Sequence, residues 1–300
     1  MRYLLIINPE AQLGIPKRKQ DALIKMAHSV LGKGKVFIVG KDRKEALQDI
    51  NFDTVIFCGG DGTLHHGIQW LPLTNVKIGL VPLGSGVDFA TALKIPKRNK
   101  EAFEIIHQGK TKQVDLGRIN GRLFANTVSF GFDAFINLLQ HGKIRPKMKK
   151  IKKLLIPVDA KWCYVLALLY YFLPWVKFTP IRLQISTESI ETSGIIHLLA
   201  ITNSFRYGGG FRINPYAKPD DGVLDACLVS PLGKHSILAK LYSTRRGTHI
   251  YDKKVQTFCF ERMTIQSETP ITPQADGEIL QPDTYFRIEV LKGALKIFAP

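Results

Sequence analysis

The chain has 300 residues, 45% of them hydrophobic, and its 42 Lys and Arg against 25 Asp and Glu give a formal net charge of +17. This composition excludes a wholly disordered chain, and the length allows one large domain or two medium ones. The positive charge favours a polyanionic partner, either nucleic acid or an anionic membrane surface.

The cysteines are scattered and form no CxxC pair. Their spacing predicts neither a zinc site nor a disulfide framework and favours reduced thiols in the cytosol. The N-terminal MRYLLIINPE is too short for a secretory signal, and no apolar run reaches the roughly 20 residues of a spanning helix. We therefore expect a cytoplasmic protein that is soluble or peripherally associated with a membrane.

The first part of the chain alternates strand-like and helix-like segments. A buried strand is expected at 3–7, and further strands are expected at 35–39, 54–58 and 77–81. Helices are expected at 18–31, 43–50, 64–71 and 99–108. This alternation predicts a mainly parallel, doubly wound α/β sheet, in which ligands bind beyond the carboxyl ends of the strands.

After about residue 112 the pattern changes to short β-type runs separated by turns, which predicts an antiparallel sandwich or barrel. The runs lie at 122–130, 181–186, 195–202, 223–229, 255–260 and 284–290. A basic and apolar stretch at 143–178 and a helix near 234–246 interrupt them. We expect a nucleotide-binding α/β domain over 1–125 and an all-β domain over 126–300, and we leave open whether the C-terminal tail packs back on the first domain.

Two glycine-rich loops follow predicted strands, GGDGT at 59–63 and PLGSGVDFA at 82–90. Glycines at a strand end let backbone N–H groups approach phosphate oxygens, and a following helix adds its positive N-terminal end. The carboxylates Asp61 and Asp88 can hold a magnesium-bound phosphate or accept a proton from a hydroxyl. A tight turn with Asp61 as an N-cap is the alternative for GGDGT alone. Two such loops at neighbouring strand ends favour a nucleotide.

Five motifs together resemble the diacylglycerol-kinase-type lipid kinases, a group that includes sphingosine and ceramide kinases, and most closely its soluble bacterial branch. They are GGDGT at 59–63, P-x-G-[ST]-x-x-D-F-A at 82–90, VDLG at 114–117, NSFRYGGGFRINPYAKPDDGVLD at 203–225 and ADGE at 275–278. The resemblance covers nearly the whole chain. The run at 203–225 is distinctive, whereas GGDGT also occurs in NAD kinases and 6-phosphofructokinase relatives.

The resemblance implies an ATP- and Mg²⁺-dependent kinase that phosphorylates a free hydroxyl of a lipid such as diacylglycerol. It implies that the ATP phosphates and magnesium contact Gly59, Gly60, Asp61, Gly62 and Thr63, with Ser85 nearby at the second loop and Asn8 of the N-P loop also binding the nucleotide. Asp88 and Asp115 would belong to an acidic network around the catalytic magnesium. Asp276 and Glu278 would lie opposite the nucleotide, where one of them takes the proton from the lipid hydroxyl, with Asp276 slightly favoured.

The resemblance also implies a second, structural magnesium at KPDDGV. The side chain of Asp221 and the carbonyl groups of Lys218 and Val223 would bind it, since hard oxygen ligands on a tight turn suit this ion.

Departures from the family pattern lie on the nucleotide side. The Asn-Glu pair that usually follows GGDGTL is His65-His66 here, and the residue before Asp88 is Val87. They leave open a catalytically weak or inactive lipid-binding homologue. The shared GGDGT leaves an NAD kinase as a second alternative, against which the match at 203–225 speaks. Because adjacent helical residues point about 100° apart, we expect no metal site from the histidines, with one at the cleft rim and the other outward.

The stretch KIRPKMKKIKK at 143–153 precedes an aromatic-rich apolar segment that extends to 178. A basic cluster beside such a segment predicts docking on an anionic membrane surface. A core-facing helix with a solvated basic linker is the alternative, and both can hold together. No recognised nucleic-acid motif accompanies the charge, so we expect no nucleic-acid partner.

Overall fold

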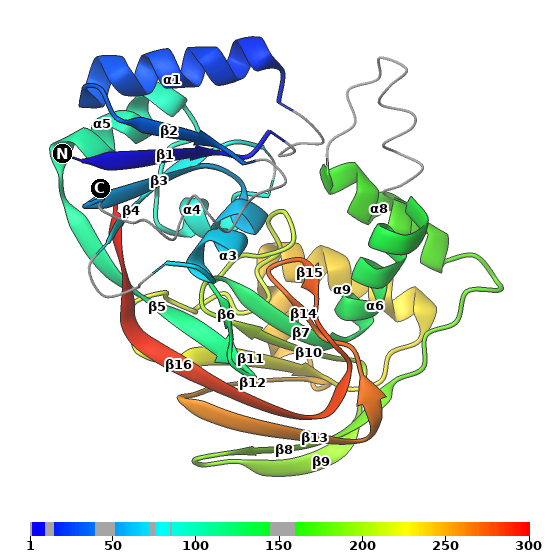
Figure 1. Ribbon diagram of the computed structural model, residues 1–300. Coiled ribbons are helices and arrows are strands. Elements are labelled where there is room, and N and C mark those ends of the chain that lie inside the picture. The colour runs from blue at the N-terminus through cyan, green and yellow to red at the C-terminus, as the bar shows by residue number, and fades with distance from the viewer. Residues whose placement is uncertain (1, 10–14, 40–51, 72–75, 85, 145–159) are drawn as a thin grey trace.

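The computed structural model describes residues 2–9, 15–39, 52–71, 76–84, 86–144 and 160–300 (Figure 1). The predicted helix at 43–50 lies outside the described residues.

The N-terminal half is a parallel sheet with helices around it. Its strands are β1 (Tyr3–Ile7), β2 (Lys35–Ile38), β3 (Thr54–Gly59) and β4 (Lys77–Pro82), in the order β2-β1-β3-β4. Its helices are α1 (Lys17–Leu31), α3 (Asp61–Ile68), α4 (Asp88–Ala92) and α5 (Asn99–Gln108). Every residue of β1 and β3 is buried, as the unbroken apolar runs predict for strands that are covered on both faces. In Figure 1, α1 and α5 lie on one side of these strands and α3 on the other.

The C-terminal half is a β-sandwich. One antiparallel sheet has the order β12-β11-β10-β7-β14-β15. Its strands are β7 (Thr127–Gly131), β10 (Leu198–Thr202), β11 (Leu224–Val229), β12 (Val255–Phe260), β14 (Gln274–Ala275) and β15 (Glu278–Ile279). The opposite layer contains β5 (Thr111–Ile119), β6 (Arg122–Phe124), β8 (Ile181–Thr187), β9 (Glu191–Ile196), β13 (Arg262–Ile271) and β16 (Asp283–Phe298). The rings of Phe130 and Phe286 meet edge to face between the layers, with centroids 5.0 Å apart. The predicted fold class, α/β followed by an antiparallel sandwich, is confirmed.

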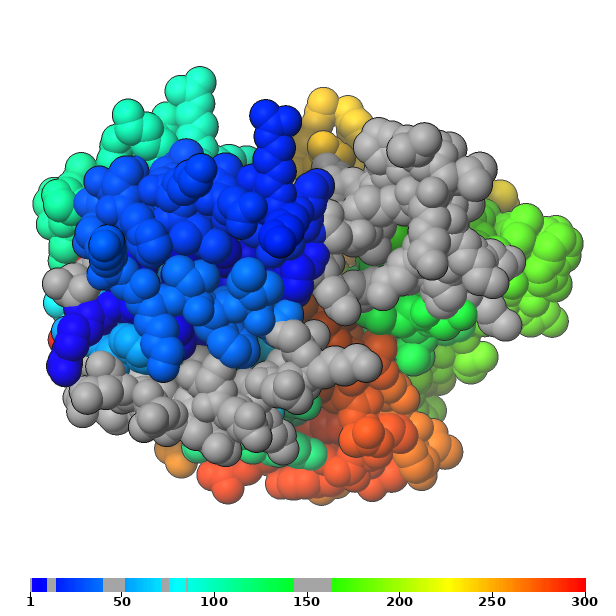
Figure 2. Space-filling model, turned by 45° about the horizontal axis from the view of Figure 1, so that its top comes forward, coloured from blue at the N-terminus to red at the C-terminus, as the bar shows by residue number. Residues whose placement is uncertain are grey.

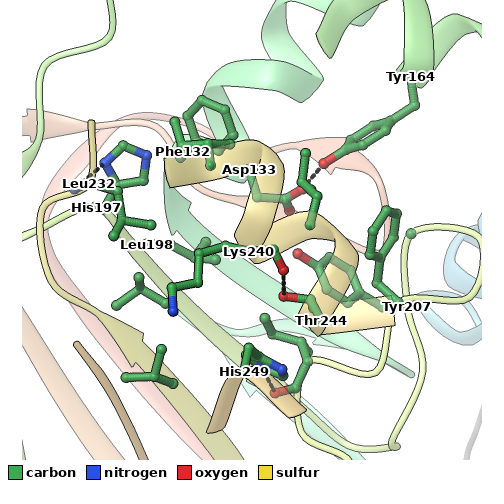
Figure 3. A pocket seen from close by; sticks show the side chains of 17 residues that line it. Phe132, Asp133, Tyr164, His197, Leu198, Tyr207, Leu232, Lys240, Thr244 and His249 are labelled. Carbon is green, nitrogen blue, oxygen red and sulfur yellow. Dashed lines mark hydrogen bonds between the residues drawn. The ribbon is translucent and has the colours of Figure 1, made fainter. Parts of the chain in front are cut away.

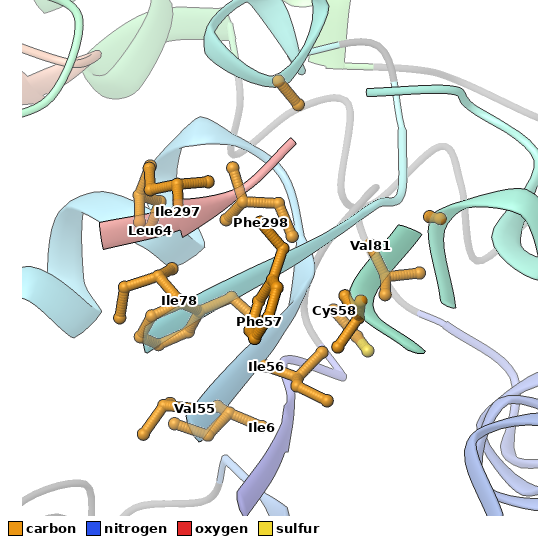
Figure 4. Packing of buried hydrophobic residues seen from close by; sticks show 14 of the residues in the cluster. Ile6, Val55, Ile56, Phe57, Cys58, Leu64, Ile78, Val81, Ile297 and Phe298 are labelled. Carbon is orange, nitrogen blue, oxygen red and sulfur yellow. The ribbon is translucent and has the colours of Figure 1, made fainter. Parts of the chain in front are cut away.

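The long strand β16 runs through both halves of the molecule. Its first part pairs antiparallel with β13, and its last part pairs parallel with β4 through Lys296 and Ile297. Ile297 and Phe298 are buried in the same core as Ile56 and Phe57 of β3 (Figure 4). One sheet therefore continues from the N-terminal half into the sandwich.

A layer of helices covers one side of the sandwich. These helices are α6 (Phe132–Leu139), the π-helical turn η2 (Gln140–Ile144), α8 (Ala160–Tyr171), α9 (Lys234–Arg246) and the 3-10 turn η3 (Thr248–Tyr251). The predicted helix near 234–246 is thereby confirmed. Buried side chains of α6, α8 and α9 form a separate apolar cluster around Phe132, Ala167 and Ile237. In the part of the chain that the structure describes, none of the helices combines the length and apolarity that crossing a bilayer requires.

Candidate active site

An open cleft of about 1060 Å³ separates the ends of β3 and β4 from the turn between β14 and β15. Asp61, Gly62 and Asp88 line it on one side, and Asp276 and Glu278 line it on the other. In Figure 2 the blue surface of the N-terminal segment and the orange surface of the C-terminal strands lie on opposite sides of this region. The cleft thus brings carboxylates from both halves of the molecule together.

The two predicted glycine loops are in direct contact. The Asp61 N–H donates to the carbonyl of Gly86 at 2.8 Å, and a Cβ on Gly60 would come within 2.5 Å of the same oxygen, which explains the glycine. The Asp61 carboxylate accepts the N–H groups of Asp88 at 2.9 Å and Phe89 at 3.3 Å. Asp61 therefore caps α4, the helix of the other loop, and locks the two loops into one unit.

Negative charge accumulates in this unit. Burial, followed by the charge of Asp88 and a smaller effect of Asp276, raises the pKa of Asp61 to about 7. The Asp88 side chain is also buried; it accepts the N–H of Gly209 at 2.6 Å, and Arg206 Nε lies 3.8 Å from its other oxygen. Two buried carboxylates in contact with one helix end are oxygen donors of the kind that a divalent cation suits.

A second cavity, of about 450 Å³, lies beside the Asn-Pro loop. Phe37, Phe57 and Trp70 give it apolar walls, while Asn8, Thr63 and His66 give it a polar side. Asn8 Nδ2 donates to Thr63 Oγ1 at 3.3 Å, so the N-P loop and GGDGT meet as their shared strand-end position predicts. Ser85 lies outside the described residues.

Asp276 is the most firmly held carboxylate in the cleft. Its backbone is left-handed, with φ 48°, and its oxygens accept N–H groups from Ala125 at 2.8 Å and from Asn126 and Thr127 at 2.9 Å. His65 Nδ1 lies 3.0 Å from Oδ2, and both side chains are fully buried. A carboxylate has about four acceptor positions, and these four neighbours occupy them.

The side chain of Glu278 is more exposed to solvent than that of Asp276. Its side chain is 35% exposed, and one oxygen lies 3.3 Å from His66 Nε2. The hydrogen bond with His66, opposed by burial, lowers the pKa of the Glu278 carboxyl. The expectation that one histidine points outward was wrong, because the ADGE turn places two carboxylates where adjacent residues of α3 each reach one of them.

Asp115 lies away from the cleft, beside the KPDDGV turn. Its carboxylate accepts the N–H groups of Gly222 and Gly293, each at 2.7 Å, so it holds the KPDDGV turn against β16 and does not line the cleft. Asp221 is exposed on that turn and accepts the Val223 N–H at 3.3 Å. The structure thus brings Asp115 towards the predicted structural-metal turn and not to Asp88. Among the described residues, no group of three or more His, Cys, Asp or Glu forms a ready metal site.

An apolar cavity of about 670 Å³ adjoins the cleft, and Asp133, Tyr164, Tyr207 and Gly208 line both (Figure 3). Figure 3 shows the Tyr164 phenol reaching the Asp133 carboxylate, to which it donates at 2.9 Å. Asp133 also accepts from Ser129 at 2.6 Å and Gln274 at 3.0 Å, and burial raises the pKa of its carboxyl. Sequence reasoning missed Asp133; the available signal was a lone carboxylate within the apolar run FGFDAF.

Comparison with known proteins shows that this chain is similar to kinases along nearly its whole length. Residues 2–119 match the diacylglycerol kinase catalytic domain, and residues 126–299 match the YegS C-terminal NAD kinase beta sandwich-like domain. A diacylglycerol kinase of Mycobacterium tuberculosis is 29% identical over 95% of this chain and 93% of its own length. A diacylglycerol kinase of Staphylococcus saprophyticus is 28% identical over 100% of this chain and 95% of its own length.

Solved structures agree on the fold. A Bacillus anthracis chain superimposes with a TM-score of 0.81 at 20% identity, covering 100% of this chain and 95% of its own. A second structure from that organism, of a diacylglycerol kinase, gives 0.74 at 21% identity and covers 100% and 97%. The matched domains account for both halves of the molecule and confirm the predicted enzyme class: this chain belongs to the family of diacylglycerol-kinase-type lipid kinases.

Proposed function

We propose that this kinase transfers the γ-phosphate of ATP, with Mg²⁺, to a free hydroxyl of a lipid such as diacylglycerol. The observation that carries the proposal is the junction of two spaces. A cleft flanked by Asp61 and Asp88 on one side and Asp276 and Glu278 on the other adjoins an apolar cavity. We assign the phosphate donor to the cleft, and the acyl chain to the cavity because its lining is mostly apolar.

The nucleotide would lie along the ends of the parallel strands. Its base would enter the cavity beside Asn8 and Phe37, and its phosphates would lie over the Gly60–Gly62 backbone at the N-terminal end of α3. A helix N-terminus preceded by glycines offers unpaired N–H groups and a partial positive charge to phosphate oxygens.

Magnesium fits the donors that the structure provides. Asp61 and Asp88 offer carboxylate oxygens. Burial, followed by the charge of Asp88, raises the pKa of Asp61, and a cation beside the two carboxylates would favour their charged forms. When bound, the ion neutralises and orients the phosphates. The Asp221 turn offers a second candidate. Burial, followed by the charge of Asp221, raises the pKa of Asp225 to about 7.

The acceptor hydroxyl would attack the γ-phosphorus while the bond to the β-phosphate bridging oxygen breaks and ADP leaves. We assign Glu278 as the group that takes the hydroxyl proton, because it lines the cleft with acceptor positions still open. Asp276, with its acceptor positions filled, would act by fixing the ADGE turn. The lowered pKa of Glu278 is compatible with this role, since a loose phosphoryl-transfer transition state needs positioning more than a strong base.

The acyl chain of the acceptor would occupy the apolar cavity, with the lipid hydroxyl directed into the cleft past Asp133. Asp133 and Tyr164 line both spaces, so the polar head region of the acceptor would lie beside them where the two spaces meet.

A lipid substrate also requires access to a membrane, and we propose peripheral association through residues 143–178. Residues 145–159, which include most of the basic cluster, lie outside the described residues. Cys163, Ala167 and Tyr171 of α8 are buried, so the core-packing alternative applies to one face of that helix. Leu169 and Trp175, 59% and 70% exposed, are large apolar side chains suited to the interface.

The test is phosphorylation of a panel of lipids with labelled ATP, followed by mass spectrometry of the products. Asp61→Ala and Asp276→Ala should both lose turnover, and unchanged turnover in both would exclude the mechanism. Calorimetry with Mg-ATP addresses the inactive-homologue alternative, which predicts no binding. Including NAD as an acceptor addresses the NAD kinase alternative, which predicts phosphorylation of NAD in preference to any lipid.

A further inference from the structure

A basic groove of about 860 Å³ lies next to the cleft between Asp61 and Glu278, which we call the transfer cleft. The groove is separate from that cleft and from the two cavities. It runs between α4, the glycine turn at 206–212 and the end of α9. Its charged lining residues are Lys97, Arg206, Arg212, Arg245 and Asp88. Asp88 and Gly209 also line the cleft, so the two spaces share a wall.

Positive charge in the groove is largely uncompensated. Within the described ranges, Lys97, Arg212 and Arg245 form no ion pair with any residue. Asp88, the only carboxylate among the described residues that line the groove, lies 3.8 Å from Arg206 and accepts the N–H of Gly209. Four cations around one carboxylate concentrate a positive potential that the described residues compensate only in part.

The Arg206 guanidinium packs against the glycine turn beside the groove. A Cβ on Gly210, whose φ is +111°, would come within 2.9 Å of Arg206 Nη2, so the guanidinium packs directly on glycine backbone. Arg206 Nε is buried and has no hydrogen-bond partner among the described residues. A guanidinium whose Nε donor has no partner among the described residues is suited to bind a phosphate or carboxylate oxygen.

We propose that this groove binds a phosphate group outside the transfer cleft. Its polar and basic lining excludes an acyl chain or a metal ion and favours a tetrahedral oxyanion that several guanidinium groups can share. The ligand is either a phosphodiester head group of an anionic lipid or a free phosphate. This site does not depend on the phosphotransfer reaction, because its occupation requires no turnover.

The experiment measures binding of inorganic phosphate to the full chain by calorimetry. In Arg212→Ala/Arg245→Ala, the dissociation constant for phosphate should rise about tenfold or more, because the phosphate loses its charged hydrogen bonds to both guanidinium groups. The control, Arg182→Ala/Arg246→Ala, has the same net charge and removes exposed arginines outside the groove; it should bind as the unmodified protein does. Equal phosphate binding by the two double variants would overturn the proposal.

Two further arms identify the source of the phosphate. Vesicles of phosphatidylcholine, with and without phosphatidylglycerol, are sedimented with each protein. Binding that requires phosphatidylglycerol and is lost in the groove variant assigns a lipid head group. Phosphate binding without this dependence assigns a free phosphate. If Asp61→Asn abolishes phosphate binding and the groove variant retains it, the phosphate lies in the transfer cleft and the proposal fails.

Discussion

His65 Nδ1 lies 3.0 Å from Asp276 Oδ2, and neither side chain reaches solvent. The other ring nitrogen, Nε2, lies 3.3 Å from Arg122 Nη2. A guanidinium can only donate, so Nε2 accepts and the ring proton is on Nδ1, where it is donated to Asp276. Arg122, His65 and Asp276 therefore form one directed chain of hydrogen bonds that ends at the ADGE turn.

Loss of these hydrogen bonds should lower kcat more than it weakens nucleotide binding. We expect His65→Leu to lower kcat about 10- to 100-fold while the KM for ATP changes less than about threefold, because His65 positions Asp276 and touches no nucleotide atom in the proposed arrangement. His65→Asn keeps an amide N–H for Asp276 and should retain more of kcat. Steady-state kinetics with each variant measures both constants. Equal losses in the two variants would contradict the donor role.

Asp276 and Glu278 should respond differently to neutralisation. Glu278→Gln should lower kcat about 10²- to 10⁴-fold with unchanged stability, as expected for a proton acceptor that is open to the cleft. Asp276→Asn should lower kcat and also destabilise the fold by about 2–4 kcal/mol, because three backbone N–H groups lose a charged acceptor. Urea unfolding together with initial rates separates these effects. Full activity of Glu278→Gln would exclude Glu278 as the base.

The apolar cavity can be narrowed without touching the nucleotide side. Leu241 of α9 lines it, so Leu241→Trp should raise the KM for a long-chain diacylglycerol about tenfold and leave Mg-ATP affinity unchanged. Leu238 lies on the same helix but is 52% exposed and outside the cavity lining, which makes Leu238→Trp the matched control. A short-chain acceptor should be less affected. If both variants behave alike, the acyl chain binds elsewhere.

The N-terminal strands could be predicted from sequence because each is an apolar run that ends at a turn signal. The strand at 284–290 was predicted at less than half the length of β16. Its second part is interrupted by Gly293, with φ +57°, where the pairing with β5 shifts register between Leu291 and Leu295. A bulge in the middle of a strand breaks the alternation on which the prediction rests.

The glycine loops of the site were also predictable, since glycines at neighbouring parallel strand ends converge by topology. The partners of the carboxylates were not. Asp115 meets Gly222 and Gly293, residues far from it in sequence, and Asp276 is saturated by a backbone turn at 125–127. These contacts depend on the pairing of β16 with β5 and of β14 with β7, which local patterns do not encode.

Magnesium should stabilise the fold through the KPDDGV turn. The raised pKa of Asp225, about 7 against 3.8, means that without metal its burial costs stability as pH rises from about 4 towards 7. Added Mg²⁺ should therefore raise the melting temperature more at pH 8 than at pH 5. Asp221→Ala should remove most of this increase. Asp220→Ala, which only breaks an ion pair with Lys112 at 2.7 Å, should retain it. An equal magnesium effect in both variants would exclude the proposed ligand.

His197 should make the fold sensitive to mild acid. Its ring is 3% exposed and packs between Phe132 and Phe178, with both centroids 5.0 Å away, and burial lowers its pKa from 6.5 to about 4. Between these values the unfolded chain binds a proton that the folded chain does not, so the free energy of unfolding falls as pH drops from about 6.5 to about 4. After allowance for solvent screening, we expect a loss of about 1–2 kcal/mol.

The raised pKa values of Asp61 and Asp225 have the opposite effect, because these carboxyls make the free energy of unfolding rise as pH drops over part of this range. The test therefore compares variants with the unmodified protein. In His197→Phe the ring cannot be protonated, and the difference in unfolding free energy between pH 7 and pH 4.5 should shrink by that amount. His235→Gln changes an exposed histidine of α9 and should leave the difference as it is. Urea unfolding at both pH values measures it, and an unchanged difference in His197→Phe would show that His197 does not cause the acid sensitivity.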